Sequence, residues 1–295
     1  MLLGAAKILV ELRPQLPGTV KLIFQPAEES APVGKAGGAR QMIEENVLKD
    51  PEVSAIFGQH VNPELPTGKL GYREGALLAG ADHFRITIKG KQSHGAMPWL
   101  GIDPIVAAAH VAIAVQTIVS RGIDPRKPVV VTIGTIKAGT AWNIIPGEAV
   151  MEGTIRTHDE AVRRQVLEQL CRIARHTALA HGATAEAVHS SYGTPTRNNP
   201  ELVRRMKPTL DRTAGAANVI VVEPHMGAED FAEYAQRKPG FFIFLGVRNE
   251  AIGAVHNLHT PKAMVDEAAL PLGSRLLATL AIDFLRGEAR RGALK

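Results

Sequence analysis

The sequence predicts an α/β domain with a mostly parallel sheet, interrupted by an inserted α+β domain. Short apolar runs at 20–24, 53–58, 218–222 and 241–247 alternate with helical patterns, which is typical of a parallel sheet covered by helices. Between these runs, Phe84, Ile86 and Ile88 alternate with polar residues, as expected of a strand with one solvated face. A chain of 295 residues is long enough for two domains.

The two ends of the chain are expected to form one discontinuous domain, over residues 1–78 and 193–295. Leu2, Ala5, Leu9 and Leu12 share one helical stripe, so a helix over 2–12 is predicted before Pro14. The strand at 20–24, a helix at 37–48 and the strand at 53–58 follow. After residue 193 the pattern predicts helices from 200 and 229, strands at 218–222 and 241–247, and a last helix over 266–285.

The middle of the chain, residues 79–192, has a different pattern. A strand around 84–88, a helix over 103–121, strands at 129–136 and 150–157, a helix that carries Cys171 and a strand at 184–189 follow one another. This order is the split βαβ arrangement of ferredoxin-like domains. The joints near Ala79 and Gly193 are short and contain glycine, which suits a hinge.

Composition excludes several classes of protein. Lys and Arg total 34 against 29 Asp and Glu, but this excess is spread along the chain and aromatic residues make up only 4%, so no nucleic-acid partner is expected. No apolar run reaches the length of a membrane span, so we expect no membrane segment. The single cysteine, Cys171, excludes an internal disulfide and favours a reducing compartment, which indicates a cytoplasmic location.

An acidic pair, Glu28 and Glu29, stands where the strand at 20–24 ends, and His60 follows the strand at 53–58. The carboxyl ends of parallel strands meet at one edge of a sheet, where ligands bind. His259, in AVHNLHTP, follows the last predicted strand. Carboxylate and imidazole ligands suit zinc, manganese or cobalt. The pattern predicts a metal site formed by Glu29, His60 and His259, with Glu28 beside it as a base that takes a proton from water.

Each of these residues also has a simpler interpretation. A Glu-Glu pair is usually part of a solvated loop, His60 could be a hydrogen-bonded interior histidine, and His259 could be a surface loop residue. Their joint placement at one edge of the predicted sheet is what favours the metal site.

The inserted domain contains a second set of candidates: His94 in GKQSHGAMP, Asn143 in GTAWNIIPGEA and Arg156 in GTIRT. An imidazole and an amide could stabilise an oxyanion, and a guanidinium could bind a carboxylate. The alternatives are a turn-forming amide for Asn143 and, for Arg156, a cross-strand ion pair with Glu148 or Glu152.

Six motifs in order along the chain resemble the aminoacylase/carboxypeptidase metallohydrolase family: LIFQPAEE, FGQHVNPELPTGKLG, IKGKQSHGAMPWLGIDPI, GTIKAGTAWNIIPGEAVMEGTIRT, MGAEDF and LHTPK. They are similar above all to its amidohydrolase branch, which includes hippurate hydrolases, N-acyl-amino-acid amidohydrolases and indole-acetyl-amino-acid hydrolases. The resemblance implies a catalytic domain with a two-metal centre and an inserted lid that forms a homodimer. It also implies hydrolysis of N-acyl amino acids to a carboxylic acid and an amino acid.

The resemblance implies a role for each candidate in the discontinuous domain. Glu28 matches the family's general base, and Glu29, His60 and His259 match its metal ligands.

In the inserted domain, His94 matches the lid histidine that reaches the active site of the partner subunit and stabilises the tetrahedral oxyanion. Asn143 and Arg156 match residues that hold the carbonyl or carboxylate of the substrate.

One feature departs from the family pattern. In the family, a Cys-Gly-His-Asp-type motif and the first strands of the sheet precede the helix that here begins at Leu2. We therefore expect an N-terminally truncated chain with an incomplete two-metal centre. The alternatives to an active amidohydrolase are a catalytically impaired dimer that binds acyl-amino acids without turnover, or a related dipeptidase or deacetylase.

Overall fold

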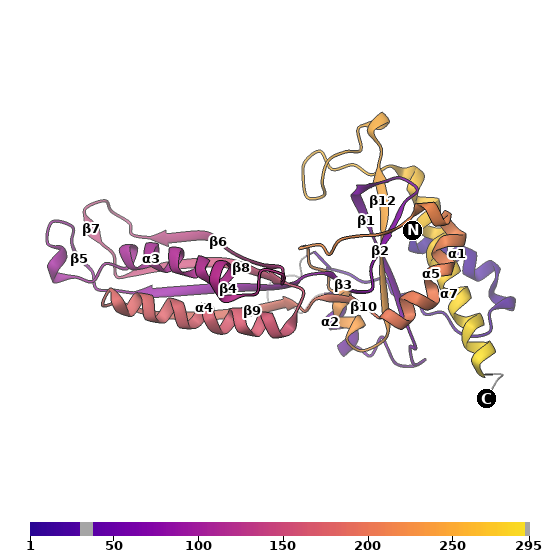
Figure 1. Cartoon of the computed structure of the whole chain (residues 1–295), viewed down its shortest axis with the longest axis horizontal. Coiled ribbons are helices and arrows are strands. Elements are labelled where there is room, and N and C mark those ends of the chain that lie inside the picture. Colours follow the sequence, from indigo (N-terminus) through magenta and orange to yellow (C-terminus); the bar gives the residue numbers. More distant parts are fainter. Residues whose placement is uncertain (30–37, 293–295) are drawn as a thin grey trace. The chain divides into compact units, whose positions relative to one another are not determined.

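The computed structural model describes residues 1–29 and 38–292, which divide into two compact units. The first unit comprises Met1–Leu77, Thr196–Pro224 and Asp230–Lys295, and the second comprises Leu78–Pro195 and His225–Glu229. Figure 1 labels most of the helices and strands of both.

A four-stranded sheet forms the centre of the first unit, in the order β1-β12-β2-β11. Its strands are β1 (Ile56–Pro66), β12 (Gly240–Arg248), β2 (Leu70–Tyr72) and β11 (Val219–Val221). β1 is parallel to β12 and β11 is parallel to β2, but β2 is antiparallel to β12. The sheet is therefore mixed. The three residues between β1 and β2 are too few for a parallel crossover, and the Lys69 N–H donates to the Pro66 carbonyl (3.1 Å) in this reversing turn.

Helices cover this sheet because β12 is apolar on both of its faces. Phe241, Ile243 and Leu245 are fully buried and share a core with Met206 of α5 (Pro200–Ala214) and Leu276 of α7 (Leu270–Gly292). On the other face of β12, the Phe242 ring lies 4.9 Å from that of Phe231, the first residue of α6 (Phe231–Ala235).

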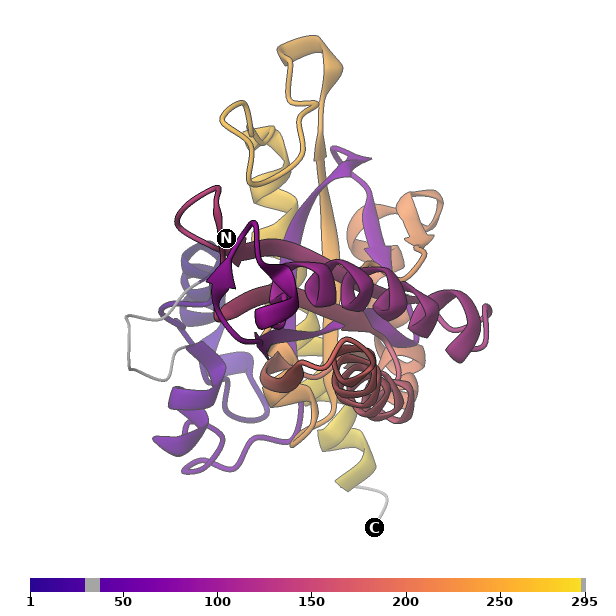
Figure 2. The same ribbon diagram turned by 90° about the vertical axis from the view of Figure 1, so that its left-hand side faces the viewer.

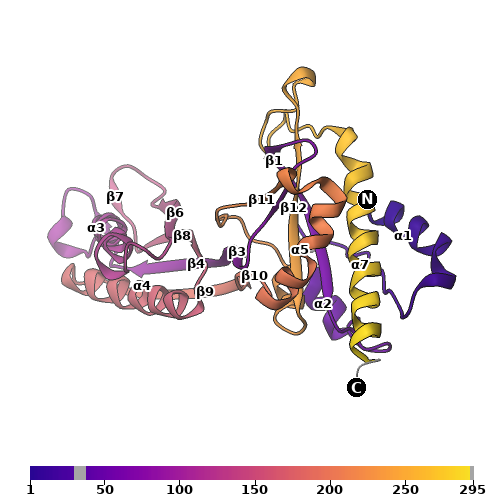
Figure 3. The same ribbon diagram turned by 45° about the vertical axis from the view of Figure 1, so that its right-hand side comes forward.

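A smaller core joins the N-terminal helix to the C-terminal one. Ala5 and Leu9 of α1 (Leu2–Glu11) pack against Ala278 of α7, and Figure 3 shows the two helices side by side. The predicted helix over 2–12 is thus confirmed. The remaining elements of the unit are α2 (Gly38–Glu44), the two-stranded pair β3 (Gly75–Leu78) and β10 (Thr196–Asn198), and 3-10 turns at Arg13–Gln15, Ala216–Asn218, Glu250–Ile252 and Glu267–Ala269.

The prediction of a strand at 20–24 is wrong. Among the described residues this segment pairs with no strand, and Val20 and Leu22 pack against the small core of α1 and α7 instead. The Lys21 ammonium donates to the carbonyls of Val47 (3.0 Å) and Lys49 (2.6 Å). The apolar residues Val20 and Leu22 are therefore explained by contact with helices and not by a place in the sheet. The predicted helix at 37–48 is also shorter than expected, and its first residue lies outside the described residues.

The second unit contains a four-stranded antiparallel sheet in the order β6-β8-β4-β9. Its elements follow the chain as β4 (Gly80–Lys89), α3 (Pro104–Thr117), β6 (Val129–Ala138), β8 (Glu148–Thr157), α4 (Glu160–Ala180) and β9 (Thr184–Gly193). This is the split βαβ order of ferredoxin-like domains. The two helices pack on each other and share the core of the sheet, and Figure 2 shows them together.

The alternation predicted for the first strand of this unit is confirmed. Phe84, Ile86 and Ile88 are fully buried in the core, and the residues between them lie on the other face. Beyond the end of β4, a two-residue ladder joins β5 (Ser93–His94) to β7 (Ile144–Ile145), with a 3-10 turn at Pro98–Leu100. α3 continues as a π turn over Ile118–Gly122.

Two helical segments, Pro104–Gly122 and Glu267–Arg291, are long and apolar enough to cross a membrane by length and composition alone. This differs from the expectation that no apolar run is long enough. Each segment has one buried side in the core of its own unit, where Val111 and Val115 of the first and Leu276 and Leu280 of the second are fully buried. A helix that packs on a core passes the same test of length and composition.

Candidate active site

The acidic pair follows an unusual backbone turn. Ala27, directly before Glu28, has a φ of 56°, in the left-handed region that residues with a Cβ rarely adopt. Such a conformation persists only where the surrounding structure holds it, and it is commonest at functional sites.

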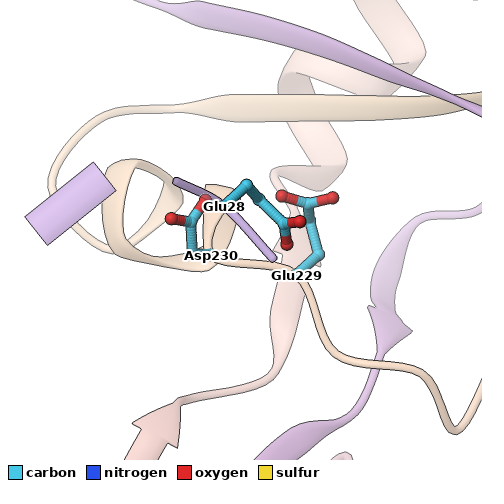
Figure 4. Close-up of side chains that lie close together, drawn as sticks. All are labelled: Glu28, Glu229 and Asp230. Atoms are coloured by element: carbon cyan, nitrogen blue, oxygen red, sulfur yellow. The ribbon is translucent and has the colours of Figure 1, made fainter. Parts of the chain in front are cut away.

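Glu28 belongs to a cluster of carboxylates. One carboxylate oxygen from each of Glu28, Glu229 and Asp230 lies within 4.8 Å of the others, and these three form the one such group of His, Cys, Asp or Glu found in residues 1–29 and 38–292. Figure 4 shows the Glu28 side chain between those of Asp230 and Glu229. Three negative charges this close repel one another unless a cation or a proton joins them.

The surroundings of Glu28 raise the pKa of its carboxyl above the ordinary value. The largest cause is desolvation, followed by the negative charges of Asp230 and Glu29, although part of the side chain remains exposed. The charge of His60 and a hydrogen bond from the Asp230 backbone N–H act in the opposite direction. Glu28 is therefore a carboxylate that binds a proton more readily than a solvated one does.

Two of the predicted metal ligands lie next to each other. The Nε2 atom of His259 is 3.9 Å from Oε1 of Glu29, and both side chains are exposed. His259 comes from the loop between β12 and α7, and its φ of 62° is again left-handed. The structure thus joins two residues that are 230 positions apart in the sequence (259 − 29).

His60 does not stand at the end of a strand, as predicted, but inside β1, opposite Phe244 of β12. The prediction failed because β1 continues to Pro66, well beyond the apolar residues that marked it. Its Nδ1 lies 2.8 Å from the Val61 carbonyl oxygen, which makes Nδ1–H the donor of that contact and leaves the lone pair on Nε2. A histidine that binds a metal through one nitrogen commonly donates from the other in this way.

The donor set fits a divalent metal ion. Carboxylates and imidazoles are the ligands of zinc, manganese and cobalt sites, and the close carboxylates at Glu28 need positive charge nearby. The predicted ligands Glu29, His60 and His259 are all in the first unit. Glu29 and His60 are both close enough to Glu28 to change the pKa of its carboxyl, Glu29 by raising it and His60 by lowering it.

In the second unit, His94 and Asn143 are neighbours. His94 is opposite Ile144 in the β5–β7 ladder, and the Gly95 N–H donates to the Asn143 carbonyl (2.8 Å). The His94 Nδ1 accepts from the Ala96 N–H (3.0 Å), so the ring proton of the neutral imidazole is on the exposed Nε2. This nitrogen can donate a hydrogen bond to a negatively charged oxygen.

Arg156 lies at the end of the four-stranded sheet that is far from the β5–β7 ladder. Its neighbour on β4 is Ala81, and His94 comes five residues after the other end of this strand, so most of the length of β4, about 26 Å at about 3.3 Å per residue, separates the two. Its guanidinium donates to the Ile155 carbonyl (3.1 Å), and burial lowers its pKa. The alternative ion pair with Glu152 is not the one formed, since Glu152 lies 3.5 Å from Arg85.

Sequence reasoning missed Glu229 and Asp230 as members of the site. Their motif, MGAEDF, contributed only to the resemblance, and the segment was interpreted as the start of a helix. The signal was a second pair of adjacent carboxylates in a loop between a strand and a helix, the same pattern that singled out Glu28 and Glu29.

These features define a chain of two units, with carboxylate and imidazole side chains that suit a metal-dependent enzyme on its α/β unit. A family model described as Peptidase family M20/M25/M40 matches residues 1–283, and the chain belongs to this family. The family resemblance inferred from the six motifs is thus confirmed. The protein is an amidohydrolase or peptidase, an enzyme that acts on amide bonds.

The chain is similar to several named proteins and solved structures. It is 41% identical over 285 residues to thermostable carboxypeptidase 2 of Saccharolobus solfataricus, a match of 96% of this chain and 70% of that protein. It is 39% identical over 284 residues to N-acetylcysteine deacetylase of Bacillus subtilis, covering 96% of this chain and 71% of the relative. Its fold resembles the crystal structure of the Bacillus subtilis YXEP protein, described as a dinuclear metal binding peptidase from the M20 family. That match has a TM-score of 0.78 and 36% identity, over 97% of this chain and 70% of the other.

Proposed function

We propose that this protein hydrolyses the amide bond of N-acyl amino acids, to give a carboxylic acid and a free amino acid, with Glu28 as general base at a divalent metal centre. The observation that carries the proposal is the placement of Glu28. Its carboxylate lies within 4.8 Å of those of Glu229 and Asp230, and it is close enough to His60 and Glu29 for both to act on its pKa. A carboxyl with a raised pKa is suited to proton transfer near neutral pH.

The metal is proposed to be zinc, manganese or cobalt, held by Glu29, His60 and His259 as part of a two-metal centre. The similarity to a protein described as a dinuclear metal binding peptidase supports this proposal. A bound metal would supply a positive charge that polarises the amide carbonyl and acidifies water.

The residues of the chain would perform the proton transfers and hold the substrate. Glu28 takes a proton from the attacking water and returns it to the leaving nitrogen of the amide. The Nε2–H of His94, with the Asn143 amide beside it, donates to the oxyanion that forms on the former carbonyl oxygen. Arg156 binds the carboxylate of the substrate.

The positions of these groups within the second unit support a homodimer. Because the length of β4, about 26 Å at about 3.3 Å per residue, separates Arg156 from the β5–β7 ladder that carries His94, a single second unit cannot bring both to one small substrate. We propose that one copy supplies Arg156 and the other supplies His94, as lid residues that close over the substrate.

The proposed dimer surface is the open edge of the second unit. β6 is an edge strand whose last five residues are all exposed, and Ile136 among them is 53% exposed. Beside it, α3 exposes Ile113, and a hollow of about 390 Å³ lies between Gln116 of α3 and β6. An unpaired edge with apolar side chains is a template for pairing with another strand, and a second copy of β6 offers the same edge.

A second candidate is the cleavage of short peptides, which the similarity to a protein named thermostable carboxypeptidase 2 favours. Both reactions use water to cleave an amide bond next to a free carboxylate. They differ in the group on the acyl side, which carries an amine in a peptide and none in an N-acyl amino acid.

The test is metal content together with hydrolysis. The purified chain is loaded with zinc, manganese or cobalt, its metal stoichiometry is determined by elemental analysis, and it is assayed on N-acetylcysteine, hippurate and a dipeptide. We expect bound metal, turnover of the N-acyl substrates, and loss of turnover in Glu28→Gln. Turnover of the dipeptide alone would favour the second candidate. Metal-free protein with no turnover of any substrate would contradict both.

A further inference from the structure

The carboxylate of Asp230 accepts hydrogen bonds from distant segments and not from its own helix. Asp230 is the N-cap residue of α6, a position where an aspartate side chain usually accepts hydrogen bonds from the first amides of its own helix. Here it makes no such bond. Both of its oxygens accept instead from the Gln25 side-chain amide, at 2.8 Å each, and Oδ2 also accepts from the Ala39 N–H at 2.8 Å.

These bonds join three separate segments of the first unit. Gln25 lies three residues before Glu28, Ala39 is at the start of α2, and Asp230 is at the start of α6. A fourth group completes the network, because the hydroxyl of buried Tyr234 donates to the Gln25 side-chain oxygen (2.9 Å). Both polar atoms of the Gln25 amide group, Nε2 and Oε1, therefore have a hydrogen-bond partner in this network.

The network leads back to Glu28. One carboxylate oxygen of Glu28 lies within 4.8 Å of one of Asp230, and the Asp230 backbone N–H is close enough to Glu28 to act on the pKa of its carboxyl. The residue whose side chain holds Gln25 therefore also faces Glu28. Between Gln25 and Glu28 the chain passes through Ala27, whose left-handed φ of 56° is maintained only if the residues on both sides are held. Asp230 holds Gln25 on one side and faces Glu28 on the other.

The backbone of α2 approaches this carboxylate closely at Gly38. Gly38 has a φ of 56°, and a Cβ at this position would lie 1.9 Å from Oδ2 of Asp230 and 3.0 Å from the Gln25 Nε2. The glycine thus allows the backbone of α2 to approach Asp230 closely enough for the Ala39 N–H to donate to it.

We propose that Asp230, with Gln25 and Tyr234, is a positioning unit that fixes the direction of the Glu28 carboxylate. The proposal rests on the proposed role of Glu28 as the base. Asp230 touches neither substrate nor water in this scheme, and it acts through its amide and through Gln25. Its loss should lower the rate of the chemical step and leave substrate binding largely unchanged.

The test exchanges the two polar groups of the network. Asp230→Asn replaces one of the two oxygens that accept from Gln25 and Ala39 with an NH₂ group, which can only donate. Gln25→Glu places two carboxylates against each other. In the double variant Gln25→Glu/Asp230→Asn, the new amide at 230 donates to the new carboxylate at 25, its oxygen accepts from Ala39, and the Tyr234 hydroxyl keeps an acceptor. Each single variant should lower kcat at least tenfold with a change in KM below threefold, and the double variant should recover most of the loss.

A second readout needs neither metal nor turnover. The amide of residue 230 reports on the Glu28 carboxylate, so its hydrogen exchange is measured by NMR in the metal-free chain, with Glu28→Gln as reference. We expect exchange at residues 39 and 230 to become at least tenfold faster in Asp230→Asn and to return toward the original rate in the double variant. Unchanged protection at residue 230 in Asp230→Asn would overturn the proposal whether or not the chain is active. Absence of turnover with the expected exchange changes would instead contradict the proposed function.

The matched control is Asp266→Asn. Asp266 is also in the first unit, is only 6% exposed, and accepts from the Asn249 side chain (2.8 Å) and the Ala268 N–H (3.0 Å), but it is not part of the network around Glu28. This variant should lower stability and leave kcat and the exchange at residue 230 unchanged. An equal fall of kcat in this control would show that the loss in Asp230→Asn reflects general destabilisation.

Discussion

The imidazole of His259 lies 3.9 Å from the carboxylate of Glu29, at Nε2 and Oε1. Neither side chain is buried, and no other described group forms an ion pair with either of them. Two exposed side chains gain little from this contact alone, because a surface pair contributes only about 0–1 kcal/mol. The left-handed backbone at His259 indicates that the loop is held in place for another purpose, which we propose is metal binding.

The replacement His259→Ala should therefore weaken metal binding at least tenfold, since even residues that only orient ligands contribute 10–100-fold to affinity. Zinc titration by calorimetry measures this. The control is His256→Ala, which removes an exposed histidine from the same loop and should leave the affinity unchanged. Equal losses in the two variants would contradict the assignment of His259.

Glu28→Gln should lower kcat by about 10²–10⁴-fold, the range that a general base contributes. Metal content should be retained, because Glu28 is proposed to be beside the metal ligands and not one of them.

Since the pKa of Glu28 is raised, the base is lost by protonation at a higher pH than for a solvated glutamate. Activity should fall on the acid side, as pH decreases through this raised pKa. Glu201→Gln, an exposed glutamate on α5, is the control for the assay.

The ion pair of Asp82 with Arg163 should be important for the stability of the second unit. Asp82 is 1% exposed and accepts from the Arg163 Nε at 2.6 Å, and the Asp82 carboxylate raises the pKa of Arg163. Arg163→Met leaves a buried charge without its partner, which should lower the free energy of unfolding by about 3–5 kcal/mol in urea denaturation.

The matched control for this variant is Arg126→Met. Arg126 pairs with Asp124 at 2.7 Å but is 88% exposed, so this change should lower stability far less than Arg163→Met does. Similar losses for the two variants would mean that burial of Asp82 does not decide the energy of the pair.

Asp159 should stabilise α4 as its N-cap and through its charge. It accepts from the N–H groups of Ala161 (2.9 Å) and Val162 (3.2 Å) and pairs with Lys127. Asp159→Ala should cost about 1 kcal/mol of stability, whereas Asp159→Asn keeps the cap and loses only the charge.

The pH dependence of this effect has a defined sign. The bond from Lys127 and those from the two amides lower the pKa of Asp159 in the folded state. Its charge therefore contributes stability above the ordinary aspartate pKa, and the contribution is lost as pH falls through the lowered pKa. The difference between the original chain and Asp159→Asn should disappear on acidification, and a difference that grows on acidification would refute this.

Ile136→Lys should weaken the proposed homodimer, because it places a charge on the exposed edge of β6 where the second copy would pair. Sedimentation measures the monomer fraction over a concentration series. Val221→Lys, which places the same charge on the exposed edge strand β11 of the first unit, should leave the dimer intact. A dimer that is equally strong in both variants would place its interface elsewhere.

Sequence patterns predicted most of the longer elements correctly. β12 is a run of eight buried residues, and the helix α1 has its apolar residues on one stripe, so their periodicity is local and strong. Patterns failed for the segment at 20–24, where apolar residues pack on helices, and for β2, whose three residues carry no periodicity. They also placed His60 at a strand end, because the polar second half of β1 does not resemble a strand.

The amino-acid sequence by itself determined the chemistry that is available: the acidic pair at Glu28, the histidines at 60 and 259, and the motifs that identify the family. These depend on residue type and on short spacings, which are visible in one dimension. Only the tertiary structure decided which groups meet. Asp230 turns from its own helix to Gln25, 205 residues away, and Arg156 is separated from His94 by the length of a strand. Such contacts depend on packing between distant segments, and no local pattern in the chain contains that information.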